Sequence, residues 1–192
     1  MKKSDFLIAG VGGQGTLLTG KIIAAAAQLE GYDTKTSETH GMAQRGGSVV
    51  IHVRAGRKVY APLVPPGEAD YLIAFEKLEA LRFLPWLSPQ GTVIVNRQVI
   101  NPLPVLTGKE SYPQGITEAL EPYARRVIPV NARELDPVRR HPRTANLLLL
   151  GILARQMDYP RESWLRAAEE LIPSRHLQVN RLAFDAGWEY QK

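Results

Sequence analysis

The stretch that decides the fold is Phe6-Leu7-Ile8-Ala9-Gly10-Val11-Gly12-Gly13-Gln14-Gly15-Thr16. Its first four residues are apolar and predict a short buried strand, and the glycines that follow have the spacing G-x-G-x-x-G. Residues 16–29 are then rich in alanine, leucine and isoleucine, which predicts a helix. A strand, a glycine-rich turn and a helix in this order indicate the first unit of a Rossmann-like sheet.

The glycine-rich turn is also a candidate binding site. Glycine allows a tight turn and lets a ligand approach the backbone closely. Exposed amides at the start of the helix, together with the positive end of its dipole, favour an anion such as a pyrophosphate. The alternative is that the glycines only make the turn, and the motif by itself does not decide between the two.

A dinucleotide cofactor would need one further residue. In NAD-binding folds an acidic side chain about 20 residues after the motif, at the end of the second strand, holds the ribose hydroxyls. Asp33 comes early for this role and Glu38 comes somewhat late. An NAD(P)-dependent dehydrogenase or a nucleotide-binding module therefore stays open as an alternative, without a complete fingerprint.

The rest of the chain continues to alternate between strands and helices. Apolar and β-rich runs predict strands at residues 32–36, 48–53, 58–60, 71–75, 91–96 and 126–130, and helices are predicted at 76–84, 116–125, 146–157, 161–171 and 176–187. Residues 54–57 would join two of these strands as a β-hairpin, and Pro129 indicates that the last strand lies at a sheet edge. We predict one α/β domain over residues 1–192: a Rossmann-like, mostly parallel sheet with helices on both faces, a β-hairpin insertion and a helical C-terminal region.

The composition of the 192 residues is that of an ordinary globular protein, with 44% hydrophobic and 22% charged residues. The absence of cysteine excludes disulfides, thiolate zinc sites, cysteine nucleophiles and any iron–sulfur cluster held by this chain's own thiolates. The four histidines are scattered, so we expect no metal site. No apolar run reaches about 18 residues and the first residues lead directly into a strand, so we expect a cytoplasmic protein without a membrane segment.

The formal net charge of +5 at pH 7 fits a nucleic acid, a phosphate-bearing cofactor or an acidic protein partner. Much of the charge comes from arginines in residues 125–143, which lack interleaved aromatic residues. We therefore expect a solvated or partner-facing surface and no nucleic-acid partner.

A second distinctive stretch is Glu38-Thr39-His40-Gly41-Met42-Ala43-Gln44-Arg45-Gly46-Gly47-Ser48, which reads as a polar loop. Arg45 can make a bidentate contact with a carboxylate or phosphate, and the two glycines after it allow close approach to the backbone. His40 could titrate near neutral pH. The plainer interpretation is a surface loop with a structural arginine, and for His40 itself we favour that interpretation over a catalytic base.

Together, the two motifs resemble the gamma domain of the 2-oxoacid:ferredoxin oxidoreductases, of the type found as the beta subunit of the indolepyruvate enzymes. Residues 69–76, 146–151 and 180–184 also fall where that family has its later recognisable segments, so the resemblance spans nearly the whole chain. Ile51 departs from the family pattern, because a small polar residue is expected at that position.

The resemblance implies a non-catalytic subunit of a heteromeric enzyme. Such an enzyme oxidatively decarboxylates an aryl pyruvate, such as indolepyruvate, to an acyl-CoA and reduces ferredoxin; pyruvate or 2-oxoglutarate could replace the aryl substrate. Thiamine diphosphate and the iron–sulfur clusters would lie on a larger catalytic alpha subunit, with coenzyme A as co-substrate. The sequence agrees, since it has no cysteine and no Gly-Asp-Gly of the family's thiamine diphosphate motif.

By the same resemblance, the glycine-rich turn and the Arg45 loop would contact the partner, the diphosphate region or coenzyme A, and these three remain open. The residues assigned to this site are Gly10, Gly12, Gly13, Gln14, Gly15, Thr16, Thr39, His40, Gly41, Arg45, Gly46, Gly47 and Glu76. No catalytic residue is assigned. Glu76 follows a predicted strand and could equally cap the next helix, and we expect Asn146 to cap the helix that it opens.

Overall fold

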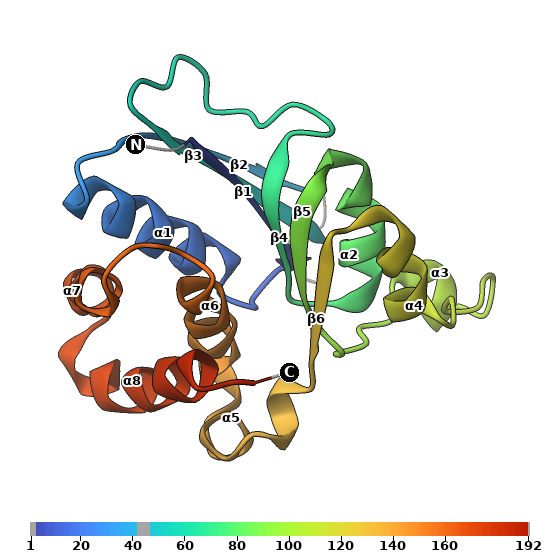
Figure 1. Cartoon of the computed structure of the whole chain (residues 1–192). Coiled ribbons are helices and arrows are strands. Elements are labelled where there is room, and N and C mark those ends of the chain that lie inside the picture. Colours follow the sequence, from blue (N-terminus) through green and yellow to red (C-terminus); the bar gives the residue numbers. More distant parts are fainter. Residues whose placement is uncertain (1–2, 42–46, 192) are drawn as a thin grey trace.

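The computed structural model describes residues 3–41 and 47–191. Within these residues the sheet has six strands in the order β2-β3-β1-β4-β5-β6 (Figure 1). The strands are β1 (Ser4–Val11), β2 (Asp33–His40), β3 (Ser48–Gly56), β4 (Ala69–Ala74), β5 (Leu87–Asn96) and β6 (Arg126–Val130). β1 pairs in parallel with β4, β4 with β5 and β5 with β6, whereas β3 is antiparallel to both of its neighbours. The sheet is therefore mostly parallel, as predicted.

Helices cover both faces of the sheet (Figure 1). One face carries α1 (Thr16–Leu29), α6 (Ala145–Arg155), α7 (Arg161–Leu171) and α8 (Ser174–Trp188), and the other carries α2 (Lys77–Phe83) and α4 (Ile116–Leu120). The shorter elements are α3 (Leu103–Leu106), α5 (Asp136–Arg140) and the 3-10 turns Leu84–Trp86, Glu121–Tyr123, Ala132–Glu134 and Pro142–Thr144. In the part of the chain that the structure describes, no helix is long and apolar enough to cross a membrane.

The two covered faces explain why β1 is apolar at every position of its central run. Phe6 and Ile8 belong to the core on the α1 and α6 side, whereas Leu7 and Ala9 belong to the core on the α2 side, and all four are fully buried. Successive side chains of a strand point to opposite faces, so a strand with helices on both sides needs apolar residues throughout.

Most of the predicted elements are confirmed. α1, β6 and α7 begin and end where the sequence pattern places them, and β6, which contains Pro129, is an edge strand. The second strand is longer than predicted and continues to His40. The helix predicted at 116–125 is α4 followed by the 3-10 turn at Glu121–Tyr123, which has proline in its first turn.

The hairpin predicted within residues 48–60 is wrong. Residues 48–56 form the single strand β3, and residues 58–60 form no strand. The β-hairpin of this fold consists of β2 and β3, whose end pairs are Asp33 with Gly56 and His40 with Val49. The reason is that β3 lies between β1 and β2 and pairs with both as far as Ala55, so a turn starting at Arg54 would break two ladders at once.

α6 and α8 cross with their backbones in direct contact. A Cβ atom at Gly151 of α6 would lie far inside the van der Waals contact distance to the carbonyl oxygen of Phe184, and a Cβ at Gly187 of α8 would lie as close to the carbonyl oxygen of Leu148. Only glycine at both positions permits this approach. The crossing fastens the C-terminal helix to the buried helix α6.

Gly151→Ala and Gly187→Ala should each lower the free energy of unfolding by about 2–4 kcal/mol, because the added methyl group forces the two helices apart in spite of the higher helix propensity of alanine. Urea unfolding followed by circular dichroism measures the change. Gly56→Ala is the matched control, since the nearest atom that a Cβ at that position would meet is Cγ2 of Val59, at 3.7 Å. Equal stability of the Gly151→Ala and Gly56→Ala variants would contradict the close crossing.

Candidate functional site

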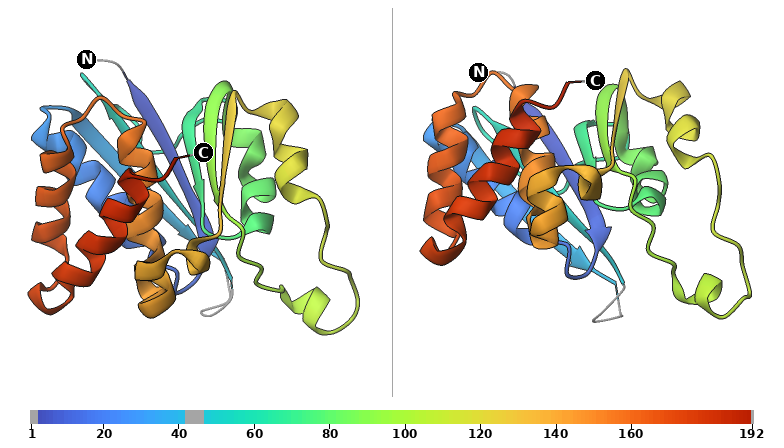
Figure 2. Two further views of the ribbon diagram at one scale, coloured as in Figure 1. Left: turned by 60° about the horizontal axis from the view of Figure 1, so that its bottom comes forward. Right: turned by 90° about the horizontal axis from the view of Figure 1, so that it is seen from below.

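The two sequence motifs meet at the carboxyl edge of the parallel strands. The glycine-rich turn follows β1 at this edge, and the end of β2 and the start of β3 reach it as well (Figure 2). The N–H of Gly12 donates to the carbonyl of Gly47 over 3.0 Å, and the N–H of Gly41 donates to the carbonyl of Ser48 over 2.8 Å. Ligands of open α/β sheets bind at this edge, so the fold places both motifs in a binding position.

Glycine is required at several points of the turn. Gly13 and Gly15 have positive φ angles, of 97° and 81°. Gly10 is required for a different reason, because a Cβ there would lie 2.8 Å from Cγ2 of Thr16. Gly12 and Gly13 are exposed, whereas Gly10 and Thr16 are buried. The surface that the turn offers to a ligand is therefore backbone.

The start of α1 is suited to an anion. Its N-cap residue, Gly15, provides no side-chain cap, and its first turn contains no acidic residue. The N–H of Thr19 is bonded to the carbonyl of Gly15 at 3.1 Å, so the N–H groups before it have no partner within the helix. With the dipole of the helix behind them, these amides and that of the exposed Gly13 can bind phosphate or diphosphate oxygens.

Gln14 holds the turn in place with both atoms of its amide. Its Oε1 accepts from the N–H of Val11 at 2.7 Å, and its Nε2 donates to the carbonyl of Phe75 at 3.1 Å and to Oε1 of Gln98 at 3.3 Å. The side chain therefore ties the turn to the ends of β4 and β5. Sequence reasoning included Gln14 in the site but had no signal for Gln98, which lies 84 positions later.

Glu76 lies at the end of β4 and is only 1% exposed. Its Oε2 accepts from the N–H of Glu79 at 3.1 Å, so Glu76 is the N-cap of α2. Its Oε1 accepts from the N–H of Ile100 at 3.2 Å and from the hydroxyl of Tyr112. Burial and the adjacent Glu76 carboxylate raise the pKa of Tyr112, so the phenol stays protonated and donates. Of the two roles open at the sequence level, helix capping is confirmed.

Ser48 connects the hairpin to α2. Its hydroxyl donates to Oε2 of Glu79, and Oε1 of the same carboxylate forms an ion pair with Arg82 at 3.1 Å. Glu79 is buried, although nothing in the local sequence marks it as part of the site. The turn, the hairpin and α2 are thus joined by side-chain hydrogen bonds at one edge.

The remaining predicted residues belong mostly to the hairpin. Thr39 and Gly41 are exposed, and Gly47 is half-buried. His40 is the last residue of β2. The predictions for Arg45 and Gly46 lie outside the described residues.

The predicted N-cap role of Asn146 is wrong. α6 begins at Ala145 with Thr144 as its N-cap, because the chain enters this helix directly from a 3-10 turn. Asn146 therefore lies within the first turn, buried against Gly15, where a Cβ would be 2.8 Å from Nδ2 of Asn146. Its Oδ1 is buried and has no hydrogen-bond partner among the described residues. The side chain packs beneath the start of α1.

The strand order disfavours a dinucleotide site. Because β3 separates β2 from β1, the end of β2 is two strand spacings, about 10 Å, from the turn's own strand. Asp33 is at the start of β2, and its carboxylate accepts from the N–H of Val59 at 2.9 Å. Within residues 3–41 and 47–191, no group of three His, Cys, Asp or Glu side chains could hold a metal ion. The edge thus lacks the adjacent acidic strand end that the dinucleotide motif requires.

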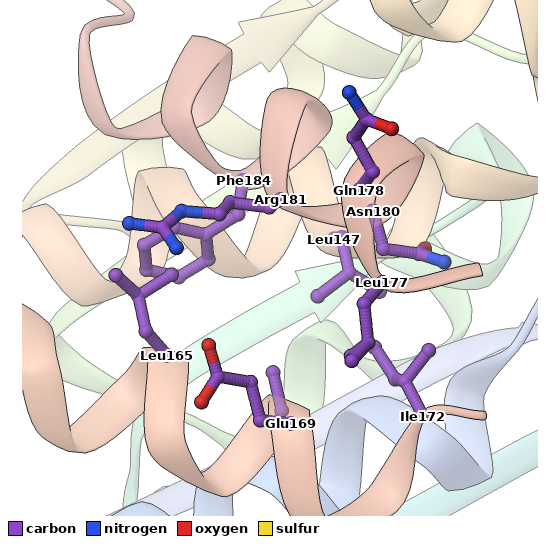
Figure 3. A pocket seen from close by; sticks show the side chains of 10 residues that line it. Leu147, Leu165, Glu169, Ile172, Leu177, Gln178, Asn180, Arg181 and Phe184 are labelled. Atoms are coloured by element: carbon purple, nitrogen blue, oxygen red, sulfur yellow. The ribbon is translucent and has the colours of Figure 1, made fainter. Parts of the chain in front are cut away.

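A separate hollow lies among α6, α7 and α8 and has a volume of about 240 Å³ (Figure 3). Its lining is mainly apolar, with a few polar side chains such as Glu169 and Arg181. None of the residues predicted for the binding site lines it. It is therefore distinct from the carboxyl-edge site.

Comparison with known proteins gives a consistent result. Residues 5–190 match the family described as pyruvate ferredoxin/flavodoxin oxidoreductase. The chain is 41% identical to the indolepyruvate oxidoreductase subunit IorB of Archaeoglobus fulgidus, over 96% of this chain and 93% of that protein. It is 40% identical to the subunit of the same name from Methanothermobacter thermautotrophicus, over 96% and 95% of the two chains. The 2-oxoglutarate:ferredoxin oxidoreductase from Magnetococcus marinus, solved with 2-oxoglutarate, coenzyme A and succinyl-CoA bound, shares the fold with a TM-score of 0.72 at 21% identity, over 98% of this chain and 31% of its own.

Gln14→Glu should lower the free energy of unfolding by about 2–3 kcal/mol at pH 7, because an ionised carboxylate cannot donate to the carbonyl of Phe75. The loss should shrink as the pH falls toward about 4, since protonation restores a donor. The pKa of the new carboxyl is higher in the folded protein than in the unfolded chain. Its stabilising contribution is therefore fully present below the pKa of the unfolded chain and is lost as the pH rises through the pKa of the folded protein. Urea unfolding at several pH values measures this.

Gln98→Glu is the matched control for this substitution. Gln98 uses its Oε1 to accept from Gln14 and Asn96, and a carboxylate can accept in the same way. The free energy of unfolding of the Gln98→Glu variant at pH 7 should stay within about 1 kcal/mol of that of the wild-type chain. If both variants were equally stable at pH 7, Gln14 would not act as a donor in the turn.

Proposed function

The chain belongs to the pyruvate ferredoxin/flavodoxin oxidoreductase family, and from this premise we propose that it is the accessory, non-catalytic subunit of an indolepyruvate oxidoreductase complex. The observation that carries the proposal is the 41% identity to an indolepyruvate oxidoreductase subunit over nearly the full length of both chains. The backbone-lined anion site proposed at the carboxyl edge is consistent with an accessory role, because its described residues would bind an anion through backbone amides.

The proposed reaction of the complex is the oxidative decarboxylation of a 2-oxoacid. The bond between the carboxylate and the keto carbon breaks, and carbon dioxide leaves. The acyl group is transferred to the sulfur of coenzyme A, the thiol proton is released, and two electrons pass to ferredoxin. An aryl pyruvate, indolepyruvate first, is the proposed substrate.

The proposal places the redox cofactors on a larger alpha subunit. Thiamine diphosphate supplies the electron sink for decarboxylation when it is bound there, and iron–sulfur clusters carry the electrons. This chain has no cysteine to ligate a cluster and no Gly-Asp-Gly sequence for the thiamine diphosphate motif, which supports the division.

The proposed task of this chain is to complete a diphosphate-binding region at the contact between subunits. The amide of the exposed Gly13 and the start of α1, beside the exposed backbone of Gly12, would face the diphosphate of coenzyme A or that of the partner's thiamine diphosphate, which share this chemistry. Thr39 and Gly41 lie exposed beside the turn, and Arg45 is proposed to add a bidentate contact. Such contacts orient an anionic ligand and exclude water.

The isolated chain should show no activity. Co-expression with the larger oxidoreductase subunit, followed by anaerobic purification, should give a stable complex that reduces a viologen dye only when indolepyruvate and coenzyme A are both present. Each chain assayed alone serves as the control. Dye reduction by the isolated chain, or failure to form a complex together with saturable NAD(H) binding in calorimetry, would refute the proposal.

Leu17→Asp should weaken anion binding without weakening the fold. Leu17 lies in the first turn of α1 and is 37% exposed, so a carboxylate there is favourable for the helix but repels a diphosphate. We expect the KM for coenzyme A, or the activation constant for thiamine diphosphate, to rise by about three- to tenfold in the complex.

Leu29→Asp is the matched control, because Leu29 is 38% exposed at the other end of the same helix. Its kinetic constants should not change. Thermal unfolding of the Leu17→Asp variant should occur at or above the original temperature. If the Leu17→Asp variant formed a stable complex in which neither the KM for coenzyme A nor the activation constant for thiamine diphosphate changed, the turn would not face a diphosphate.

A further inference from the structure

The connection between β5 and α4 forms a projecting arm, a name we use for residues 97–115. It contains the short helix α3 and otherwise little regular structure. Figure 2 shows it extending beyond the carboxyl edge of the sheet, on the side opposite α7 and α8. Long connections of this kind are uncommon in compact domains and are usually functional.

Both ends of the arm are fastened to one buried carboxylate. The N–H of Ile100, near the start, and the hydroxyl of Tyr112, near the end, both donate to Oε1 of Glu76. The hydroxyl of Tyr112 also accepts from the N–H of Leu78 at 3.2 Å, and Nζ of Lys77 lies 5.6 Å from the centre of the Tyr112 ring. The arm therefore leaves the body of the protein at a fixed place.

The tip of the arm is folded on itself. The N–H groups of Val105 and Leu106 donate to the carbonyl of Pro102, and that of Lys109 donates to the carbonyl of Pro104. The two prolines also restrict the backbone at the start of α3. A tip that is already ordered loses little conformational entropy when it binds.

The tip presents apolar side chains to solvent. Leu103 and Leu106 are 72% and 69% exposed, and Val99 near the start of the arm is 46% exposed. Residues three apart on a helix lie on the same side, so the two leucines form one apolar face. Apolar residues at this spacing are the anchors by which a short helix binds in a groove of another protein.

We propose that the arm is a docking element that inserts Leu103 and Leu106 into an apolar groove of the larger catalytic subunit. The inference rests on the function proposed above. Gln98, at the start of the arm, is bonded to Gln14 of the glycine-rich turn at 3.3 Å, so the arm and the turn share one edge. A partner that brings a diphosphate ligand to the turn therefore meets the arm as well.

Leu103→Ser combined with Leu106→Ser removes the apolar face and leaves the Glu76 contacts in place. Because both side chains are mostly exposed, the thermal unfolding of the isolated chain should not change. The Kd for the purified larger subunit should rise by at least about 30-fold. The control is Leu63→Ser combined with Leu182→Ser, two leucines of 55% and 54% exposure outside the arm, for which the Kd should stay within about threefold.

A fluorescent label locates the arm in the complex. Since the chain has no cysteine, Leu106→Cys provides a unique thiol for an environment-sensitive dye, which is attached before the larger subunit is added. Its emission should shift to shorter wavelength when the complex forms. Leu63→Cys, labelled in the same way, should show no shift.

The outcomes separate the docking role from the proposed function. If the double-serine variant bound as tightly as the wild-type chain and the dye at position 106 did not shift, the docking role would be overturned while the proposed function stood. If the wild-type chain did not associate with the larger subunit at all, the proposed function would fall and the docking role with it. A shift that depended only on the concentration of this chain would assign the arm to a second copy and overturn the inference.

Discussion

The carboxylate of Glu76 holds the carboxyl edge of this sheet together. The Glu76 side chain is only 1% exposed, and removing a carboxylate from water costs several kcal/mol. Hydrogen bonds within the protein have to offset this cost. Three groups donate hydrogen bonds to this carboxylate, one from the first turn of α2 and one from each end of the arm. The same side chain therefore fixes the start of α2 and both ends of the arm. The neighbouring residue, Phe75, extends the constraint, because its carbonyl accepts from Gln14 and from Asn96. The turn is therefore positioned by the same strand end that fixes the arm.

Elements that depend on nearby residues could be predicted from the sequence. The apolar run of β1, the glycine spacing after it and the leucine-rich pattern of α6 are each set by residues within one or two turns of chain. The position of β3 could not be predicted, because its β-rich residues suit either a hairpin with the next segment or a place between β1 and β2. Pairing with β1, which is distant in the sequence, decides between them.

The candidate site also contains residues that the sequence could predict and residues that it could not. The glycines at positions 10, 13 and 15 could be found because their requirement is local, in the φ angle or in contact with the following turn. The buried polar contacts could not, since Gln98 lies 84 positions from Gln14 and Tyr112 lies 36 from Glu76. The N-cap role predicted for Asn146 is wrong for a different reason, because the chain continues from a 3-10 turn into a helix that begins one residue earlier, at Ala145.

The inserted strand also explains how a dinucleotide-like motif can serve an accessory subunit. With β3 beside β1, the acidic end of a neighbouring second strand is absent from the turn, and the described residues of the turn offer their backbone amides for binding. Amides exposed to water hold an anion weakly, whereas the same dipoles act more strongly once a partner excludes water and lowers the local dielectric. In the proposed function, the turn is therefore one half of a site that the larger subunit closes. The docking role proposed for the arm would let association draw on apolar contacts there, so the glycines of the turn can keep the close approach to a ligand that their missing side chains allow.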